Sequence, residues 1–119
     1  ATSEAPKAVG PYSQAIEVNG TLYISGQIPV NPADGKVQEE ITAAAHQSLK
    51  NIGAILREAG MTYDNVVKTT VLLADIADFK AVNEVYAEYF TGDKPARACY
   101  QAAALPLGVK VEIEAIAVR

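Results

Sequence analysis

Hydrophobic residues along this chain follow two spacings, one typical of strands and the other typical of helices. Two short apolar runs flank Asn19-Gly20, a pair favoured in tight hairpin turns, so residues 15–25 predict a β-hairpin. Apolar residues then recur every three or four positions over roughly 39–59. This spacing predicts an amphipathic helix, and Gly60 is suited to the position just after its end.

The second half of the chain predicts a strand, a helix and two further strands. The strand covers residues 66–74 and is mostly apolar on both faces. Asp78 is placed to cap the following helix. The inward stripe of that helix is expected at Phe79, Val82, Tyr86, Tyr89 and Phe90. The last two strands flank a turn at 105–108. The order ββ-α-β-α-ββ predicts one α+β domain over residues 1–119. In this domain both helices are expected on one face of an antiparallel or mixed sheet.

The last strand is partly apolar on both of its faces. Alternate residues share a face, so one side carries Val111, Ile113, Ala115 and Ala117. The other side carries Glu112, Glu114, Ile116 and Val118. A sheet with helices on one side only should present a polar second face. Because this face is partly apolar and the mean hydropathy is slightly positive, we expect another subunit to cover it.

The composition is that of an acidic globular protein. The chain has 14 acidic and 10 basic residues, a net charge of −4 and no clustered basic patch, which argues against a general nucleic-acid binder. No apolar run approaches the ~18 residues that span a bilayer. Residues 1–10 have neither the apolar nor the basic region of a secretory signal. We therefore expect neither a nucleic-acid nor a membrane partner.

The content of cysteine and histidine limits the chemistry further. One Cys and one His exclude an internal disulfide and a zinc site built on those ligands. A single thiol is typical of a reducing, cytoplasmic setting. No glycine-rich phosphate-binding motif occurs, so we expect no nucleotide cofactor and no cofactor of another kind.

Two charged residues lie in the apolar final strands. Arg97 opens the first of these strands, and its planar fork of N–H donors is suited to binding a small carboxylate. The alternative is a salt bridge from Arg97 to Glu112 or Glu114, and composition alone favours this alternative. Glu112 has apolar neighbours, so its pKa is expected to rise from about 4.3. It is therefore a candidate general base or water-orienting group, with a solvated strand face as the alternative.

Cys99 shares a strand face with Arg97 but has no partner that would activate its thiol. His46 lies in the middle of the first helix and is expected to be exposed, so a buried structural thiol is favoured over a catalytic thiolate. The backbone N–H of Cys99 is a separate candidate, because it can donate to a ligand oxygen beside the Arg97 fork.

Four more residues are candidates for lining a site. Tyr12 follows a Gly-Pro pair in a loop, and Ser25-Gly26 end the second hairpin strand, where glycine allows another group to approach the backbone. Ordinary turn chemistry explains each of these taken singly. Asn83 borders the inward stripe of the second helix, so it either bonds a neighbouring backbone group or faces a site.

Together these segments resemble the Rid (YjgF) family of reactive enamine/imine deaminases. The resemblance runs in order through GPYSQA, ISGQIPVNPADGKV, HQSLKNIGAILREAG, VVKTTVLLADIADFKAVNEVYAEYF and PARACYQAAALPLGVKVEIEAIAVR. The last segment is long and specific. The resemblance implies a fold like that of the trimeric chorismate mutases and a homotrimer whose sheets form a central barrel. It also implies sites in the clefts between subunits.

The resemblance implies a role in substrate binding or catalysis for each candidate residue. Arg97 would bind the substrate carboxylate with help from the main chain of Cys99, and Glu112 would position water. The cleft would be lined by Tyr12, Ser25, Gly26 and Asn83. The loop before Arg97 is shorter than is usual in the family and carries Lys94 where an aromatic residue is common, which bears on the substrate range.

The implied reaction is hydrolysis of 2-imino acids and their enamine tautomers, such as 2-aminoacrylate, to 2-keto acids and ammonia. A C=N carbon is already electrophilic, so a site that holds the carboxylate and presents water requires neither a metal nor a covalent nucleophile. Three alternatives are a regulatory module that binds keto acids without turnover, a ribonuclease or translation inhibitor, and a chorismate-mutase-like enzyme. The acidic balance argues against the second, and the third needs more cationic groups than we can assign.

Overall fold

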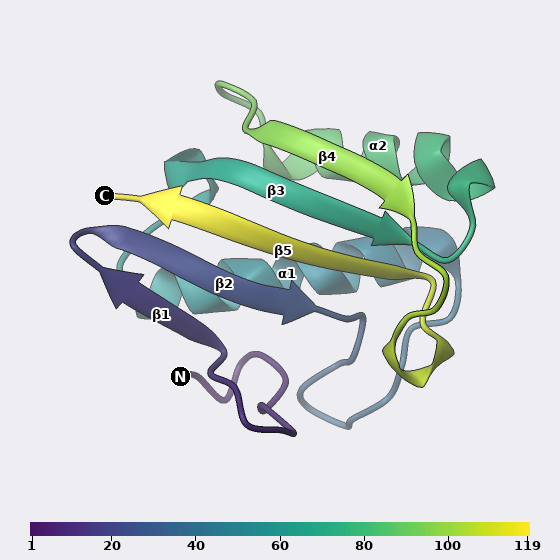
Figure 1. The fold of residues 1–119 in the computed structure, drawn as a ribbon, viewed down its shortest axis with the longest axis horizontal. Helices are drawn as coiled ribbons and strands as arrows, with labels where there is room; N and C mark the ends of the chain where they lie inside the picture. The colour runs from purple at the N-terminus through teal and green to yellow at the C-terminus, as the bar shows by residue number, and fades with distance from the viewer.

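Five strands form one mixed sheet, and two helices cover one of its faces (Figure 1). The computed structural model describes residues 1–119. The elements in chain order are β1 (Ala15–Val18), β2 (Thr21–Gln27), α1 (Ile41–Glu58), β3 (Val66–Leu73), α2 (Phe79–Tyr89), β4 (Ala96–Gln101) and β5 (Val111–Val118). The predicted α+β class and the predicted order of elements are confirmed. Neither helix is long and apolar enough to cross a membrane.

The last two strands are neighbours in sequence but not in the sheet. The strand order is β1-β2-β5-β3-β4, so β3 lies between β4 and β5. β4 runs parallel to β3, whereas the other neighbouring pairs are antiparallel. A parallel pair needs a crossover connection, and α2 provides it. β4 is therefore left at one edge of the sheet and β1 at the other.

Local chemistry explains the ends of the hairpin and of α1. Asn19 and Gly20 have φ angles of 50° and 82°, which is the left-handed geometry of a tight hairpin turn. Glu40 caps α1 by accepting a hydrogen bond from the backbone N–H of Ala43 at 2.8 Å. Gly60 follows the helix with a φ of 72°, as predicted for the residue after a helix end.

The start of α2 differs from the prediction. Asp78 stands at the N-terminal boundary of the helix, but its side chain makes no capping hydrogen bond. Its φ and ψ are −82° and 0°, not the extended values of a capping residue. Asp75 instead accepts from the N–H of Ala77 at 2.9 Å and caps a short 3-10 turn, Ile76–Asp78, that leads into α2. The cap was therefore predicted three residues too late.

The inward stripe of α2 is confirmed only in part. Its buried residues are Val82, Val85, Tyr86 and the following Phe90. Phe79 is 39% exposed, because it lies in the first turn, where it faces Arg97 and not the core. Tyr89 is only partly buried, and its hydroxyl lies 2.7 Å from Nδ1 of His46. His46 was expected to be exposed, and this contact makes it half-buried.

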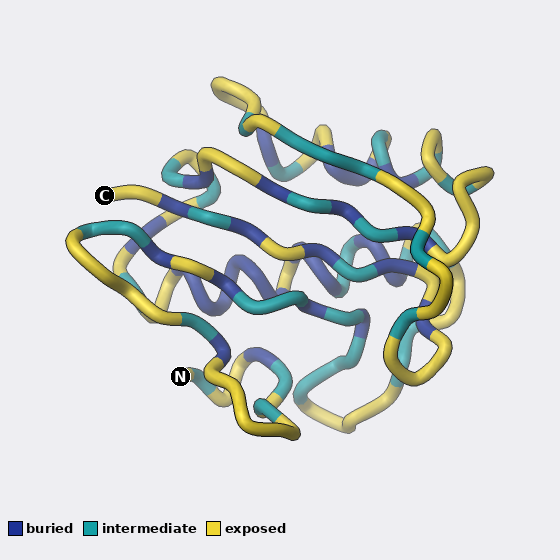
Figure 2. The backbone as a smooth tube through the Cα atoms, viewed as in Figure 1, coloured by how far each residue is buried: buried dark blue, intermediate teal, exposed yellow.

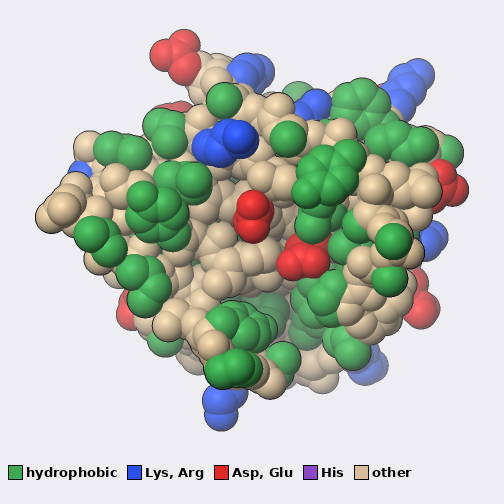
Figure 3. All heavy atoms as spheres, viewed as in Figure 1, with side chains coloured by type: hydrophobic (Ala, Val, Ile, Leu, Met, Phe, Trp, Pro, Cys, Tyr) green, Lys and Arg blue, Asp and Glu red, His purple; other side chains and the backbone are tan.

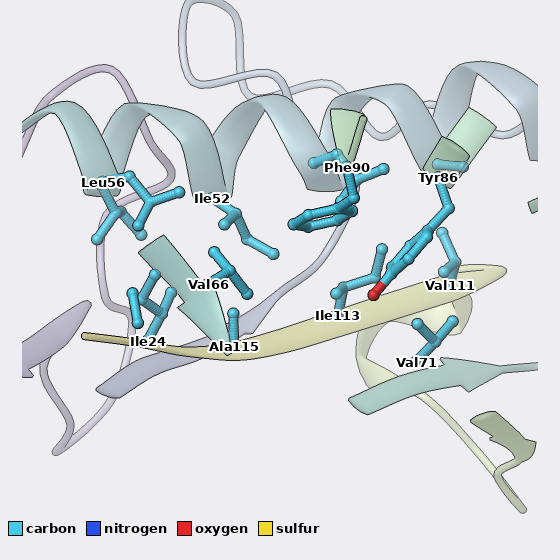
Figure 4. Close-up of a cluster of buried hydrophobic side chains, with 14 of the residues drawn as sticks. Ile24, Ile52, Leu56, Val66, Val71, Tyr86, Phe90, Val111, Ile113 and Ala115 are labelled. Atoms are coloured by element: carbon cyan, nitrogen blue, oxygen red, sulfur yellow. The ribbon is translucent and has the colours of Figure 1, made fainter. Parts of the chain in front are cut away.

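The core fills the space between the helices and the sheet. Side chains that are at most 1% exposed include Leu49, Ile52, Leu56, Val71, Leu73, Val82, Val111 and Ile113. Figure 4 shows side chains of α1 and α2 pointing down onto those of the strands. Figure 2 shows buried segments along both helices, which lie behind the sheet in this view. The predicted inner face of β5 is therefore confirmed, and removal of its apolar surface from water stabilises the two layers.

The other face of the sheet carries no helix and is partly apolar. Four of its hydrophobic side chains are 40–52% exposed: Ile16, Tyr23, Tyr100 and Val118. Glu112 and Glu114 of β5 also lie on this face, opposite to the buried positions of the strand. Figure 3 shows acidic side chains at the centre of the face with hydrophobic ones around them. The surface that the sequence led us to expect is present, and we call it the open face.

Candidate active site

Arg97 projects from β4 toward α2, on the face of the sheet that the helices cover. β4 pairs it with Thr69 of β3, which is fully buried beneath α2. Nη1 of Arg97 donates to Oδ1 of Asn83 at 2.8 Å. The guanidinium carbon lies 4.8 Å from the ring centroid of Tyr86 and 5.5 Å from that of Phe79. These contacts hold a half-buried cation between an amide and two aromatic rings.

No carboxylate neutralises Arg97. The ion pairs of the chain are Arg57–Glu4 and Arg119–Glu17, and Nε2 of His46 lies 3.9 Å from a carboxylate oxygen of Glu88. The alternative of a salt bridge from Arg97 to Glu112 or Glu114 is therefore wrong, because both glutamates lie on the open face. A guanidinium has five N–H donors, and the bond to Asn83 uses one of them. The remaining donors of the side chain have no hydrogen-bond partner within the chain, and Asn83 bonds Arg97 and not a neighbouring backbone group.

Cys99 lies two residues further along β4, on the same face as Arg97. It is half-buried and packs against the core. Burial raises the pKa of its thiol, and the nearby charge of Arg97 opposes this shift without cancelling it. The thiol is therefore mostly protonated at neutral pH, which agrees with a structural side chain and not with a catalytic thiolate. Because β4 is an edge strand, part of its backbone has no strand partner within the chain.

Glu112 lies on the open face, directly over Gly26 of β2. A Cβ added at residue 26 would collide with the carboxylate oxygen of Glu112 and would lie 3.1 Å from its Cγ. The register of β2 shifts between Ile24 and Gln27, so Ser25 and Gly26 form an irregularity in the strand. Glycine at this position therefore allows the carboxylate to rest against the backbone.

The surroundings of Glu112 favour its protonated form. Burial raises the pKa of the carboxyl, and the negative charge of Glu114 on the same face raises it further. This direction is the one expected from the apolar neighbours of Glu112. A carboxyl with a raised pKa is a better proton acceptor when ionised than an ordinary one, so it is suited to general base catalysis closer to neutral pH.

Ser25 connects the end of β2 to the loop that carries Tyr12. Its Oγ donates to the carbonyl of Ser13 at 2.6 Å, and its backbone N–H donates to the carbonyl of Gln14 at 2.9 Å. Tyr12 is 52% exposed, and its hydroxyl accepts weakly from the N–H of Val9 at 3.4 Å. The ring of Tyr12 is therefore accessible, on a loop that is held next to Gly26.

Sequence reasoning missed the residue that anchors this loop. Gln14 is only 7% exposed, and its Nε2 donates to the carbonyls of Thr2, Ala5 and Pro6. Its Oε1 accepts from the N–H of Thr2 at 2.7 Å. The side chain thus ties the N-terminal segment to the loop before β1. In the sequence this residue is only a glutamine in GPYSQA that precedes a predicted strand, and without the fold nothing distinguishes it from an ordinary surface residue.

The predicted site residues form two separate groups. We call Asn83, Arg97 and Cys99 the arginine cluster, and Tyr12, Ser25, Gly26 and Glu112 the glutamate cluster. Thr69 of β3 pairs with Arg97 on one side and with Ala115 of β5 on the other. Ala115 is three residues along β5 from Glu112. Two strand spacings of ~4.8 Å and three residues of ~3.3 Å each put the two backbone positions roughly 14 Å apart. Because the side chains also point to opposite faces, a small ligand cannot contact both within one chain.

A hollow of about 420 Å³ lies on the open face beside the glutamate cluster. Its polar lining includes Ser13, Ser25, Lys68, Thr70 and Glu114. Arg97 does not line it, which again separates the two clusters. No group of three or more His, Cys, Asp and Glu side chains is placed to hold a metal ion.

The family model described as Endoribonuclease L-PSP matches residues 2–119. The chain belongs to this family. The resemblance to Rid proteins is confirmed by its relatives, among them "Reactive Intermediate Deaminase A, chloroplastic" of Arabidopsis thaliana, which is 54% identical over 98% of this chain and 63% of its own length.

The chain is also similar to another curated relative in sequence and to a solved structure in fold. The "2-iminobutanoate/2-iminopropanoate deaminase" of Mus musculus is 58% identical over 119 residues, which is 99% of this chain and 88% of the mouse protein. The crystal structure of E. coli TdcF with bound serine superposes with a TM-score of 0.97 at 43% identity, over 100% of this chain and 96% of that one. The two-layer arrangement of helices and sheet is therefore that of the family.

Proposed function

We propose that this chain hydrolyses 2-imino acids and their enamine tautomers to 2-keto acids and ammonia. The observation that carries the proposal is the half-buried guanidinium of Arg97, which is held by Asn83 and two aromatic rings and has no carboxylate partner. Such a cation is costly to bury unless it binds an anion. The mouse relative is named for substrates in which a carboxylate adjoins a C=N carbon, and serine, bound by the E. coli protein, also has a carboxylate.

The reaction needs two groups that act on opposite ends of a small substrate. Free N–H donors of Arg97 bind the substrate carboxylate through two bonds, and the backbone N–H of Cys99 adds a third donor. Glu112 orients a water molecule and accepts its proton as the water oxygen bonds to the imine carbon. Glu112 returns this proton to the nitrogen of the resulting tetrahedral adduct, and the new hydroxyl gives up the second proton of the water to the same nitrogen. The C–N bond then breaks, the nitrogen leaves as ammonia, and the carbon becomes the keto group. Holding both reactants in place contributes several kcal/mol of barrier reduction.

The same proposal includes a homotrimer in which each site is shared by two copies. Within one chain the arginine and glutamate clusters lie on opposite faces of the sheet, so a second copy is needed to bring Glu112 to a substrate on Arg97. The apolar open face supports burial between copies, with the sheets around a central barrel. Tyr12, Ser25 and Gly26 then line the cleft from the side of the glutamate cluster.

The setting that we propose for this enzyme is the cytoplasm, without a nucleic-acid or membrane partner. The single free thiol and the net charge of −4 support it. The family name refers to an endoribonuclease, but no basic patch accompanies the acidic balance of this chain. A keto-acid sensor would use the same Arg97 site, so only a turnover assay separates that alternative from the enzyme.

The shared site is tested by mixing two inactive variants. Arg97→Ala and Glu112→Gln are each expected to lose nearly all turnover of 2-iminopropanoate while sedimenting as trimers. Glu112→Gln should weaken pyruvate binding much less than it lowers turnover, because Glu112 acts on water. When the two variants are unfolded together and refolded as mixed trimers, about a quarter of the sites regain both residues, so about a quarter of the wild-type activity should return.

Three outcomes would count against the proposal. Mixed trimers without recovered activity would mean that Arg97 of one copy and Glu112 of another do not act in one site. Wild-type protein that binds pyruvate but turns over no imine would indicate a sensor. Cleavage of RNA that persists in Arg97→Ala protein would point to a nuclease that uses another surface.

A further inference from the structure

Tyr86 lies between Arg97 and the core and contacts both. It projects from α2 and is only 7% exposed. Its ring centroid lies 4.8 Å from the guanidinium carbon of Arg97, and its hydroxyl lies 2.7 Å from Oγ1 of Thr69. Figure 4 shows the hydroxyl of Tyr86 pointing away from the helix, toward the strands. The ring therefore supports the cation from one side and is fixed at its far end by a buried hydrogen bond.

The contacts among Tyr86, Thr69 and Arg97 form a closed ring that joins the helix layer to the sheet. Thr69 is the residue that β3 pairs with Arg97 in β4. Arg97 is thus joined to Tyr86 in two ways, directly through the ring and indirectly through the strand pairing and the hydroxyl of Thr69. Asn83 lies three residues before Tyr86, on the same side of α2, and receives one N–H of Arg97 at 2.8 Å. These restraints together define the plane and the direction of the guanidinium.

We propose that Tyr86 and Thr69 are positioning residues for substrate binding. Thr69 fixes the ring of Tyr86, and the ring fixes the plane of Arg97 so that its free N–H groups face the substrate carboxylate. A bidentate bond to a carboxylate depends on the direction of both N–H groups, so a guanidinium that rotates freely loses affinity although its charge is unchanged. This inference rests on the proposed function, because it assigns the carboxylate to Arg97.

The chemistry of the Tyr86 side chain fits this role. Burial raises the pKa of its phenol, while the bond to Thr69 and the charge of Arg97 act in the opposite direction without cancelling the shift. The phenol is therefore neutral under the conditions of the reaction, and it leaves the positive charge of Arg97 available for the ligand. Phe79, the second ring, lies further away at 5.5 Å and is not held by a hydrogen bond at its far end.

The test compares four variants by pyruvate affinity and by the kinetics of 2-iminopropanoate hydrolysis. Tyr86→Leu removes the ring and should weaken pyruvate binding and raise KM roughly two- to thirtyfold, with a smaller change in kcat because Glu112 is unaffected. Tyr86→Phe and Thr69→Val remove only the hydrogen bond, so each should raise KM by less, about two- to tenfold at most. The double variant Tyr86→Phe/Thr69→Val should be no worse than either single variant, because all three lack the same bond.

The matched control is Tyr89→Phe. It removes a hydroxyl from the same helix, but that hydroxyl contacts His46 and not the arginine cluster. Its pyruvate affinity and KM should equal those of the wild type. Thermal unfolding of every variant separates loss of positioning from loss of the fold, since a loss of affinity in a protein of unchanged Tm cannot come from unfolding.

The outcomes distinguish this inference from the proposed function. Wild-type affinity in folded Tyr86→Leu, or losses that add in the double variant, would overturn the positioning role while leaving Arg97 as the carboxylate ligand. If Tyr86→Leu does not fold, the two milder single variants and their double decide. If Arg97→Ala binds pyruvate as well as the wild type does, the proposed function and this inference both fail.

Discussion

Arg97 and Glu112 project from opposite faces of one sheet, with β3 between the strands that carry them. Each has surroundings that fit the role proposed for it. Arg97 has aromatic and amide neighbours that hold a cation without neutralising it. Glu112 has a half-buried position and a glycine that lets its carboxylate rest on the backbone. If both residues act in one site, as proposed, the separation means that a second copy of the chain must complete it.

Removing the charge of Glu114 should change the pH dependence of the reaction. Glu114 raises the pKa of Glu112, so Glu114→Gln should lower that pKa and move the acid limb of the kcat/KM profile to lower pH. At pH values above that limb the rates of the two proteins should converge, because Glu112 is then ionised in both. The measurement is a pH series of initial rates, with Glu58→Gln on the far layer as the control. An acid limb that stays in place, or moves to higher pH, would contradict the coupling.

Glu112 should lower the stability of the protein at neutral pH. Its pKa is raised in the fold above the ordinary value for glutamate, so the folded chain binds more protons than the unfolded chain between the two pKa values. The contribution of Glu112 to the free energy of unfolding is therefore most favourable at pH below that ordinary value, and it falls as pH rises through the folded pKa. Glu112→Gln should gain stability relative to the wild type over this window and keep the gain above it.

The check on this stability prediction is urea unfolding of both proteins from about pH 4 to pH 8. The difference between their midpoints should widen as pH rises and then level off. A difference that is constant with pH, or one that favours the wild type at neutral pH, would mean that the carboxylate is not destabilised in the folded state.

A side chain at residue 26 should displace Glu112 without unfolding the protein. The added Cβ of Gly26→Ala would collide with the carboxylate, which is the flexible end of a side chain and can move away at small cost. Misplacing a water-orienting group by about an ångström lowers rates on the order of a hundredfold. We expect kcat to fall by about this amount while Tm and pyruvate affinity change little.

Gly92→Ala is the control for the substitution at Gly26. Its Cβ would meet only Oδ1 of Asp64 at 3.4 Å, an ordinary contact, so activity should be retained. If Gly26→Ala keeps full kcat, Glu112 does not need its observed position against the backbone.

Ser48 should be replaceable by alanine with a gain in stability. It is fully buried in α1, and its hydroxyl has no hydrogen-bond partner. Leaving a buried hydroxyl unpaired costs about 1–3 kcal/mol, part of which the small space left by the oxygen offsets. We expect Ser48→Ala to raise the free energy of unfolding by about 1 kcal/mol, also because alanine favours helices.

Asn51 is the counterpart of Ser48 on the same helix. It is also fully buried, but its Nδ2 donates to the carbonyls of Ile28 and Val30, and its Oδ1 accepts from Gln47. Asn51→Ala leaves both carbonyls without their partner and should cost about 2–4 kcal/mol. Denaturant unfolding measures both variants, and a loss of stability in Ser48→Ala would show that its hydroxyl has a partner.

Local patterns in the sequence were enough to predict the elements of this fold. Asn19-Gly20 predicted the hairpin because only a few residue pairs adopt the required turn. The alternation from Val111 to Val118 predicted the buried face of β5, because the period of a strand does not depend on its neighbours. The prediction that Asp78 caps α2 was wrong because a 3-10 turn precedes the helix. This turn depends on how the chain passes from β3 to α2, and no local sequence pattern encodes that path.

The candidate site could be predicted as residues but not as an arrangement. Arg97 and Glu112 are conspicuous in the sequence because charges in apolar strands need a reason. The sequence did not show that Arg97 and Glu112 lie on opposite faces of the sheet, because the order and the register of the strands that carry them were unknown. Tyr86 was read as a core residue, and only the structure shows its ring against Arg97 and its hydroxyl against Thr69.

The sequence by itself determined the class of fold, the family and the identity of the charged groups, since periodicity, turn chemistry and motifs are properties of neighbouring residues. The tertiary structure alone decided which strands pair, which face each charge occupies and which side chains restrain Arg97. Those facts depend on contacts between residues far apart in the chain, and such contacts are selected by the packing of the whole sheet against its helices.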